Sequence, residues 1–344
     1  MPTLEEIAEL SQFSRSTVSR VINNDPHVSP ETRKKVWQVI QKLNYQPNII
    51  ARSLAAGHTR ILGLIVPAGI ATTFEDPFFP TFIRGITSAC NAHNYSLMLW
   101  LAEPEYERRM INQILRNGLL DGLILSTIHL PDEMVEALSA SDMPFVLVGQ
   151  HHYPVDTHYV DVENRRGAQE IVTHLLRLGY ERIATITGPM DTMTARHRRQ
   201  GYVDALHSRA KVPQPVMEIE GDFTENSGYY AMQRLFDQHP QAVFAANDLM
   251  AMGAIRAIRE KGMQIPEDIA LVGFDDVPTA ANTDPPLTTV RQPSHQMGVN
   301  AAEILIDVLE HGAMYNHKVI LPTELIIRQS CGAVQQYHMA NHIT

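Results

Sequence analysis

The feature that most constrains the fold of this chain is a regular alternation of short apolar segments with helical segments, which starts at residue 61. The apolar segments are ILGLIVP, SLMLWL, DGLILS and PFVLVG, followed by RIATITGP, VMEIEG, AVFAAND and IALVGFDD. The helical segments begin near Pro80, Glu105, Pro131, Asn164, Ala195, Glu225 and Leu249. Such an alternation predicts parallel sheets that are covered by helices.

The two halves of this region resemble each other. RILGLIVP…FIRGITSACNAHNYSL and RIATITGP…RRQGYVDALHSRAKV each contain a strand, a loop, a helix with an arginine close before a glycine, and a second strand. We interpret this weak repeat as two similar lobes. Ligands of such sheets bind beyond the C-terminal ends of the strands, so the sequence predicts a binding cleft between the lobes.

The composition is that of a globular protein without a membrane segment. The 344 residues are enough for about two to three domains, and 44% of them are apolar. The longest apolar run, ILGLIVPAGIA, is too short to span a bilayer. No basic and then apolar leader follows Met1, so we expect a cytoplasmic protein. Cys90 and Cys331 are too few for a disulfide scaffold, and we expect both to be buried.

Basic residues are concentrated at the N-terminal end. Eight Lys or Arg and five Asp or Glu lie between Met1 and Arg60, a net charge of +3. The whole chain carries −10, so the rest of it carries −13. A basic head on an acidic body predicts that only the head meets a polyanion.

The basic end has the pattern of three short helices. Thr3 and Glu6 form a capping-box pattern in TLEEIAELS, and Ser14 can cap a second helix, SRSTVSRVIN, after a short break. A third helix begins in SPETRKKVWQVIQKLN, with Ser29 as the cap and Pro30 in the first turn. The tight turn between the first two helices predicts a helix-turn-helix, whose second helix reads the major groove of DNA.

The second helix has an apolar and a polar face. Val18, Val21 and Ile22 recur at helical spacing and are predicted to face inward. The side chains predicted on the opposite face are Arg15, Ser16, Thr17 and Arg20. Arginine suits guanine edges, and serine and threonine suit several bases or phosphates. A solvated helix face is the alternative, but the first helix, the turn and the spacing together favour a face that reads DNA.

A short helical segment follows in NYQPNIIARSLAAGHTR. Pro47 and Asn48 can start this helix, and it ends near Gly57. Isolated helices of fewer than about 12 to 15 residues are marginal in water. We therefore expect a linker that becomes ordered only when something holds it.

The segments SRSTVSRVIN, VSPETRKKVWQVIQKLNYQPN and ARSL resemble the head of the lac repressor (LacI/GalR) family of bacterial regulators, and the resemblance extends from Thr3 to about Gly332. It implies an all-α helix-turn-helix head, followed by a two-lobed α/β core like that of periplasmic binding proteins, with parallel sheets and chain crossings between the lobes. The implied domains are a helix-turn-helix DNA-binding domain at 1–46, a hinge helix and linker at 47–59, an effector-binding and dimerisation domain at 60–332, and a C-terminal tail at 333–344.

The resemblance also assigns DNA contacts. In the family, the hinge helices of two subunits meet in the minor groove, where a leucine wedges between the central base pairs. That leucine would be Leu54, and apolar wedges of this kind kink DNA. The sequence alone favours an ordinary packed leucine instead. The implied DNA contacts are Thr3, Ser14, Arg15, Ser16, Thr17, Ser19, Arg20, Asn23, Tyr45, Asn48, Ala51, Arg52, Leu54 and Ala55.

Polar and aromatic side chains near the ends of the predicted strands are candidates for a ligand site. Arg198 is expected just after a strand, and Asn247 and Asp275 are expected where strands end and helices begin. The resemblance implies that the effector contacts are Phe78, Phe79, Arg198, Phe223, Asn247, Asp275 and Gln292. The alternatives are core packing for each aromatic residue and helix capping for each aspartate. The family often has Asp-Asn where this chain has Glu163-Asn164, which leaves the role of Glu163 open.

The competing class is a carbohydrate- or nucleotide-processing enzyme. The neighbouring Asp275 and Asp276 point to opposite faces of a strand, whereas a glycosidase needs facing carboxylates about 5 to 10 Å apart. No phosphate loop, no G-x-S-x-G elbow and no HExxH motif occurs, so we expect no enzyme, no cofactor and no metal. A periplasmic sugar-binding protein would share the lobes but would have no use for the head.

We therefore expect a ligand-responsive transcription factor, favoured as a repressor of a catabolic operon. Its partners are double-stranded operator DNA and a small effector. Family base rates favour a sugar over a purine-type corepressor, and both an inducer and a corepressor are compatible with the sequence. The tail AVQQYHMANHIT has no leucine heptad, so a homodimer is predicted rather than a tetramer.

We expect Leu54→Ala to weaken operator binding without changing the stability of the core or its affinity for the effector, because a minor-groove wedge acts only on DNA. Operator titrations and thermal unfolding of the same variant test this prediction. A lower melting temperature, with the loss expected for a buried leucine, would show instead that Leu54 is packed inside the protein.

Overall fold

The computed structural model describes residues 2–22, 25–45, 58–66, 74–101, 118–126, 133–150, 157–209, 216–312 and 317–333. The chain forms two compact units, Met1–Arg60 and Ile61–Thr344. The predicted hinge helix, the helix predicted near Glu105 and the tail after residue 333 lie outside the described residues.

The first unit contains the three predicted helices, α1 (Leu4–Ser11), α2 (Arg15–Ile22) and α3 (Pro30–Lys42). Their apolar faces meet in one small core, which consists of Ile7, Val18, Val21, Val36 and Ile40. The predicted inward face of α2 is therefore confirmed for its two valines, while Ile22 is partly buried at the edge of this core.

The predicted caps are also confirmed. Glu6 N donates to Thr3 Oγ1 over 3.3 Å, and Thr3 N donates to Glu6 Oε2 over 2.9 Å. Thr32 N donates to Ser29 Oγ over 3.2 Å at the start of α3. These bonds satisfy backbone donors that the first turn of a helix leaves without a partner, so each helix begins at a defined residue.

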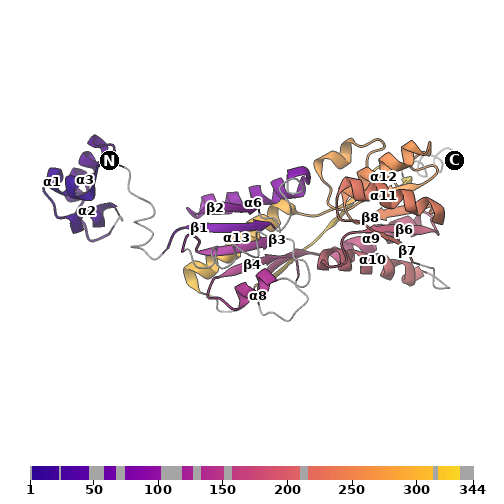
Figure 1. Ribbon diagram of the computed structural model, residues 1–344, viewed down its shortest axis with the longest axis horizontal. Helices are drawn as coiled ribbons and strands as arrows, with labels where there is room; N and C mark the ends of the chain where they lie inside the picture. Colours follow the sequence, from indigo (N-terminus) through magenta and orange to yellow (C-terminus); the bar gives the residue numbers. More distant parts are fainter. Residues whose placement is uncertain are drawn as a thin grey trace, which may run out of the picture. The chain divides into compact units, whose positions relative to one another are not determined.

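The first lobe of the second unit is built on a six-stranded parallel sheet with the strand order β11-β5-β4-β3-β1-β2. Helices α6 and α13 pack on one face, and α8 packs on the other (Figure 1). The bounds are β1 Ile61–Val66, α6 Phe78–Ala92, β2 Ser96–Leu101, β3 Gly122–Ser126, α8 Glu133–Ser139, β4 Phe145–Val148, β5 His158–Val162, α13 Ser294–His311 and β11 Lys318–Leu321.

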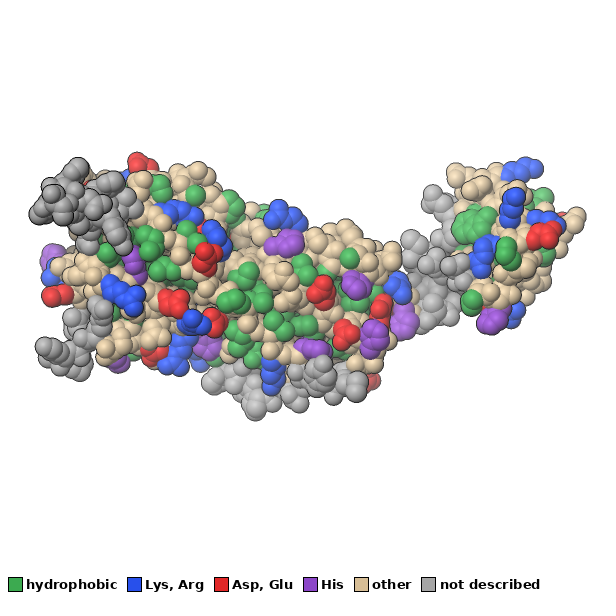
Figure 2. Space-filling model, turned by 180° about the vertical axis from the view of Figure 1, so that it is seen from behind, with side chains coloured by type: hydrophobic (Ala, Val, Ile, Leu, Met, Phe, Trp, Pro, Cys, Tyr) green, Lys and Arg blue, Asp and Glu red, His purple; other side chains and the backbone are tan. Residues whose placement is uncertain are grey.

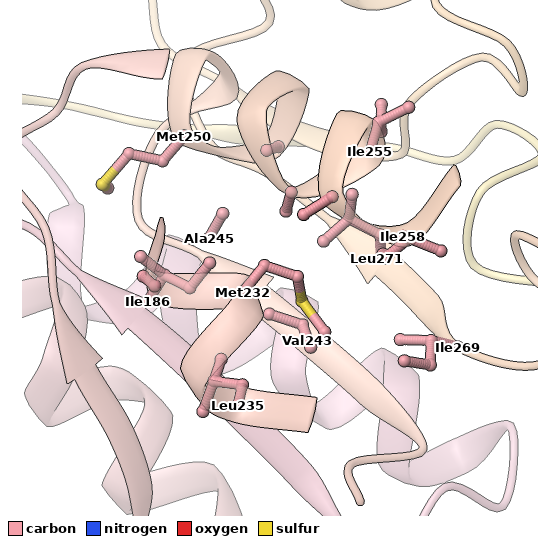
Figure 3. Packing of buried hydrophobic residues seen from close by; sticks show 14 of the residues in the cluster. Ile186, Met232, Leu235, Val243, Ala245, Met250, Ile255, Ile258, Ile269 and Leu271 are labelled. Carbon is pink, nitrogen blue, oxygen red and sulfur yellow. The ribbon is translucent and has the colours of Figure 1, made fainter. Parts of the chain in front are cut away.

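The second lobe has a four-stranded parallel sheet with the order β7-β6-β8-β9. Helices α11 and α12 cover one face and α9 and α10 the other (Figure 1). Figure 3 shows the first of these layers, in which Met232 and Ile258 of the helices pack against Val243 and Leu271 of the strands. The bounds are α9 Asn164–Arg177, β6 Ile183–Thr187, α10 Met193–Arg209, β7 Met217–Glu220, α11 Glu225–Leu235, β8 Ala242–Ala245, α12 Asp248–Glu260 and β9 Ala270–Val272.

The chain passes between the lobes three times. It leaves the first lobe from β5 to α9, returns from β10 (Thr289–Arg291) to α13, and leaves again from β11 to β12 (Glu324–Ile326). Strands β10 and β12 pair antiparallel with each other. The sequence patterns predict β1 to β4, β6 to β9, α6 and α8 to α12, but they do not predict β5, β10, α13 or the strands after Arg291.

Candidate functional site

The polar face of α2 lies as predicted. Thr17 N donates to Ser14 Oγ over 3.1 Å, so Ser14 caps this helix. Of the predicted DNA contacts, Thr3, Ser14, Arg15, Ser16 and Arg20 are exposed, and Thr17, Ser19 and Tyr45 are half-buried. These side chains form a polar surface that can approach DNA, and their contacts with DNA stay a prediction. The remaining predicted contacts lie outside the described residues: Asn23, Asn48, Ala51, Arg52, Leu54 and Ala55.

Within the second unit, a cleft lies between the two lobes, at the C-terminal ends of their strands. It encloses about 1050 Å³ of space, open solvent at its mouth included, which is ample for a small molecule. All seven residues predicted to bind an effector line this cleft: Phe78, Phe79, Arg198, Phe223, Asn247, Asp275 and Gln292. The structure thus brings together side chains that lie more than 200 positions apart in the chain, as expected for a site between lobes.

Arg198 is the centre of the cleft, with only 4% of its side chain exposed. Its Nε donates to Asn164 Oδ1 over 2.8 Å. Its Nη1 donates to the carbonyl oxygen of Ala246 over 2.7 Å and to Asp275 Oδ1 over 3.1 Å. The guanidinium also lies 3.7 Å from the centre of the Phe274 ring. A buried charge is stable only when it is paired and hydrogen-bonded, and these contacts meet that condition.

The position of Arg198 corrects the sequence prediction. It lies inside α10 rather than just after a strand, so the directions of the neighbouring arginines follow helical spacing. Arg199 is turned away from the cleft and pairs with Glu218, and Arg196 donates to the carbonyl oxygen of Met190. Only Arg198 of these three arginines lines the cleft.

Asp275 is held beside Arg198 by an unusual backbone. Its φ is 116° and that of Asp276 is 54°, and a 3-10 helix (Pro278–Asn282) follows, so the predicted passage from strand to α-helix is wrong here. Asp275 Oδ1 accepts from Arg198 and, over 2.7 Å, from Gln292 Nε2. Asp276 turns instead to Arg291 and Arg328. The two carboxylates diverge as predicted, but because of left-handed backbone conformations and not strand alternation.

Aromatic rings form both walls of the cleft. Phe223 has a φ of 68°, and its ring lies so close to Gly188 that any β-carbon there would collide with it. Its carbonyl oxygen accepts from Asn247 Nδ2 over 2.9 Å, while Asn247 Oδ1 caps α12 by accepting from Met250 N. Asn247 is therefore both a helix cap and a residue of the cleft.

On the opposite wall, Phe78 N donates to Asp76 Oδ1 over 2.9 Å, and the ring of Phe78 stacks on that of Phe82. Phe79 is buried in the core of the first lobe, so its ring is a core residue as well as part of the cleft wall. The two walls can cover the faces of a flat ring with polar groups at its edge.

Eight polar residues that line the cleft were not predicted: Asp76, Ser126, Gln150, Asp161, Asn164, Thr192, Thr194 and Asp222. Asn164 Nδ2 donates to Asp161 Oδ1 over 2.8 Å, and Arg198 donates to the same Asn164. A continuous chain of hydrogen bonds thus runs from Asp161 through Asn164 and Arg198 to Asp275. The only local signals for Asp76 and Asp161 were the segments EDPFF and HYVDVEN, in each of which an aspartate lies close to a predicted helix.

Glu163 has no part in this chain of bonds. It pairs with Arg166 over 3.2 Å and is not among the described residues that line the cleft. The side chain that reaches the cleft from this segment is that of its neighbour Asn164.

For several carboxylates of the cleft, burial makes ionisation unfavourable. Burial raises the pKa of Asp161 to about 6 and that of Asp275 to about 7, and the Arg198 charge opposes both shifts. Burial also raises the pKa of Asp76. Among the described lining residues, four carboxylates face a single guanidinium. The cleft therefore offers hydrogen-bond acceptors and suits a ligand with many donors, such as hydroxyl groups.

Two kinds of feature are absent from the described part of the chain. No group of three or more His, Cys, Asp or Glu side chains there is placed to hold a metal ion. No helix in the same part is long and apolar enough to cross a membrane. Cys90 and Cys331 are both buried and free, as predicted.

Known families and proteins resemble this chain over most of its length. Residues 3–48 match the model of the bacterial regulatory proteins of the lacI family, and residues 172–331 match a periplasmic binding protein-like domain. The HTH-type transcriptional regulator CelR of Thermobifida fusca is 35% identical, over 96% of this chain and 98% of CelR. The HTH-type transcriptional repressor PurR of Haemophilus influenzae is 32% identical, over 97% of this chain and 100% of PurR.

Solved structures share the fold. The transcriptional regulator CelR in complex with cellobiose is 34% identical, with a TM-score of 0.76 over 96% of this chain and 100% of that one. The lac repressor dimer bound to operator and the anti-inducer ONPF is 29% identical, with a TM-score of 0.85 over 96% of this chain and 99% of that one.

We expect Asp161→Asn to stabilise the ligand-free protein above pH 6 and to change little near pH 4. The pKa of Asp161 rises from 3.8 to about 6 on folding, so the folded protein binds more protons between these values and loses stability as the pH rises. The neutral asparagine avoids this cost, about 3 kcal/mol, and can still accept hydrogen bonds through Oδ1. Thermal unfolding from pH 4 to pH 8 measures the difference.

Asp204→Asn is the matched control. The hydrogen bond from Arg165 lowers the pKa of Asp204, so this variant should lose stability above pH 4 instead of gaining it. A shift of the melting temperature for Asp161→Asn that does not depend on pH would contradict the assignment of the cost to ionisation.

Proposed function

Since the chain belongs to the lacI family of bacterial regulatory proteins, we propose that it is a transcriptional repressor whose hold on operator DNA is controlled by a sugar bound in the cleft. The observation that carries the proposal is the set of buried hydrogen-bond acceptors around Arg198. They lie in the cleft between the two lobes, which aromatic rings also line. Rings and carboxylates in this arrangement suit the apolar faces and the hydroxyl edge of a sugar.

The charge of the cleft limits the ligand further. A phosphate or carboxylate group would meet four aspartates and one guanidinium that is already bonded to Asn164 and Asp275. Repulsion and desolvation then disfavour an anionic ligand, so we favour an uncharged polyhydroxylated molecule. CelR has been solved with cellobiose, which supports a sugar. A purine is the second candidate, because PurR is among the relatives.

The proposed control works through the relative position of the lobes. A ligand that contacts Phe78 on one wall and Phe223 on the other stabilises the arrangement in which both walls reach it. An effector shifts an equilibrium between two arrangements only by its difference in affinity for them. The same rule allows an inducer or a corepressor, depending on which arrangement binds the operator.

The remaining elements of the proposal follow from the family. A repressor that reads two half-sites needs two heads, so the working form is a homodimer, as in the lac repressor complex with operator. The relatives are transcriptional regulators, and the protein is proposed to act on cytoplasmic DNA without catalysing a reaction.

We expect Arg198→Ala or Asp275→Asn to remove the effector response. If the ligand is an inducer, operator binding without effector stays intact; if it is a corepressor, both variants lose regulated DNA binding. Arg199→Ala is the control, since Arg199 is the next residue of α10 and pairs with Glu218 outside the cleft. Calorimetry with a panel of sugars and nucleobases measures affinity. Normal effector affinity in both folded variants would assign Arg198 and Asp275 to purely structural roles.

We expect Arg20→Ala to relax the sequence preference of the head. One bidentate contact between arginine and guanine discriminates by about 1 to 3 kcal/mol. Lys34→Ala removes the same charge from the exposed side of α3 and should weaken binding to all sequences equally. Titrations with an operator and a scrambled duplex separate the two effects. Equal weakening by Arg20→Ala on both duplexes would show that this arginine contacts only phosphate.

A further inference from the structure

Each of the two exposed arginines on α2 faces an acid from another part of the head. Arg15 Nε lies 3.1 Å from Glu5 Oε1 of α1. Arg20 Nε lies 3.8 Å from Asp25 Oδ2, in the turn that follows α2. Acidic and basic side chains also lie next to each other on the face of this unit seen in Figure 2. The same pairing thus occurs twice, with acids from two different elements.

Both pairs use the same nitrogen atom of the arginine. In each pair Nε is the guanidinium nitrogen nearest to the acid, and within the described head neither Arg15 nor Arg20 has an ion pair or hydrogen bond with a further residue. The nitrogens Nη1 and Nη2 form the fork that can donate together to O6 and N7 of guanine. An acid at Nε therefore leaves the base-reading end of the side chain available and restricts its direction.

The backbone position of Glu5 and the side chain of Asp25 are both fixed by hydrogen bonds. Glu5 lies in the first turn of α1, whose start is set by the Thr3 and Glu6 capping box. Asp25 Oδ1 accepts from His27 N over 2.9 Å and contacts His27 Nδ1 at 3.0 Å. The backbone hydrogen bond from His27 is the main cause that lowers the pKa of Asp25, so this carboxylate stays charged beside Arg20.

Neither the stability of the head nor its affinity for DNA explains why the two acids lie beside the arginines. Ion pairs between exposed side chains add little to stability, and 70% of the Arg15 side chain and 63% of the Glu5 side chain are exposed. A carboxylate near the phosphates of DNA lowers affinity through repulsion. What an anchored acid can provide is the orientation of a flexible side chain, which favours one base over the others.

We propose that Glu5 and Asp25 are positioning residues for sequence reading: they direct Arg15 and Arg20 so that both forks meet base edges instead of phosphates. This inference rests on the proposed function as a DNA-binding regulator. It adds Glu5 and Asp25 to the residues that determine which operator sequence the protein prefers. Neither of them needs to contact a base.

The test is a selection of binding sites from a random pool of duplexes, followed by titrations of the full-length protein with the selected duplex and a scrambled one. For Glu5→Gln we expect the ratio of the two affinities to fall about tenfold, the lower part of what one bidentate base contact supplies. The preference at the base read by Arg15 should broaden. Asp25→Asn should have the same effect at the base read by Arg20, and its side-chain oxygen can still accept from His27 N.

Glu9→Gln is the matched control. Glu9 is an exposed residue of the same helix, and its substitution removes the same charge without touching an arginine of α2. It should raise affinity for both duplexes and leave their ratio unchanged. In an Arg15→Ala background, Glu5→Gln should no longer change the ratio, because the two residues act through one interaction.

The outcomes separate this inference from the proposed function. If the unaltered protein enriches no sequence, the proposed function fails and this inference with it. If the unaltered protein selects an operator but Glu5→Gln behaves like Glu9→Gln, the positioning role is refuted while the proposed function stands. Thermal unfolding of each variant verifies that the head is folded in every titration.

Discussion

The buried guanidinium of Arg198 is the group on which the rest of the cleft depends. A cation with 4% of its surface exposed must find partners inside the protein, and it bonds Asn164 at the crossing from the first lobe, Ala246 after β8, and Asp275 after β9. These three segments become neighbours only in the folded core. The guanidinium therefore ties the crossing segment to two strand ends of the second lobe and sets the polarity of the site.

The same hydrogen-bond network includes one of the segments that join the two lobes. Asp161 belongs to β5 in the first lobe and Asn164 opens α9 in the second, so their hydrogen bond spans one of the three crossings between the lobes. In the proposed mechanism, a change of angle between the lobes alters the contacts of this segment, and a ligand that bonds Asp161 or Arg198 would bias that angle.

Much of the fold could be predicted from local patterns, and the exceptions have physical causes. Apolar runs of strand length, the Thr3 and Ser29 caps and the inner stripe of α2 each depend on neighbours within a few residues. Helix α13 and strand β11 belong to a lobe to which the chain returns from far away, so no local pattern reveals their place, and the mixed stretch HYVDV gives β5 no continuous apolar run. Asp76 and Asp161 look like ordinary surface acids in the sequence. Arg198 lies in the cleft as the resemblance implied, but inside helix α10 and not directly after a strand.

The most direct test of the account is the affinity of the full-length protein for its selected operator duplex, measured with the cleft empty and with the cleft saturated. Calorimetry on the same sample verifies occupancy by the ligand found in the panel. We expect saturation to change the Kd for the operator at least about fivefold, the low end of coupling between allosteric sites. An operator affinity that is the same with a filled and an empty cleft would contradict it.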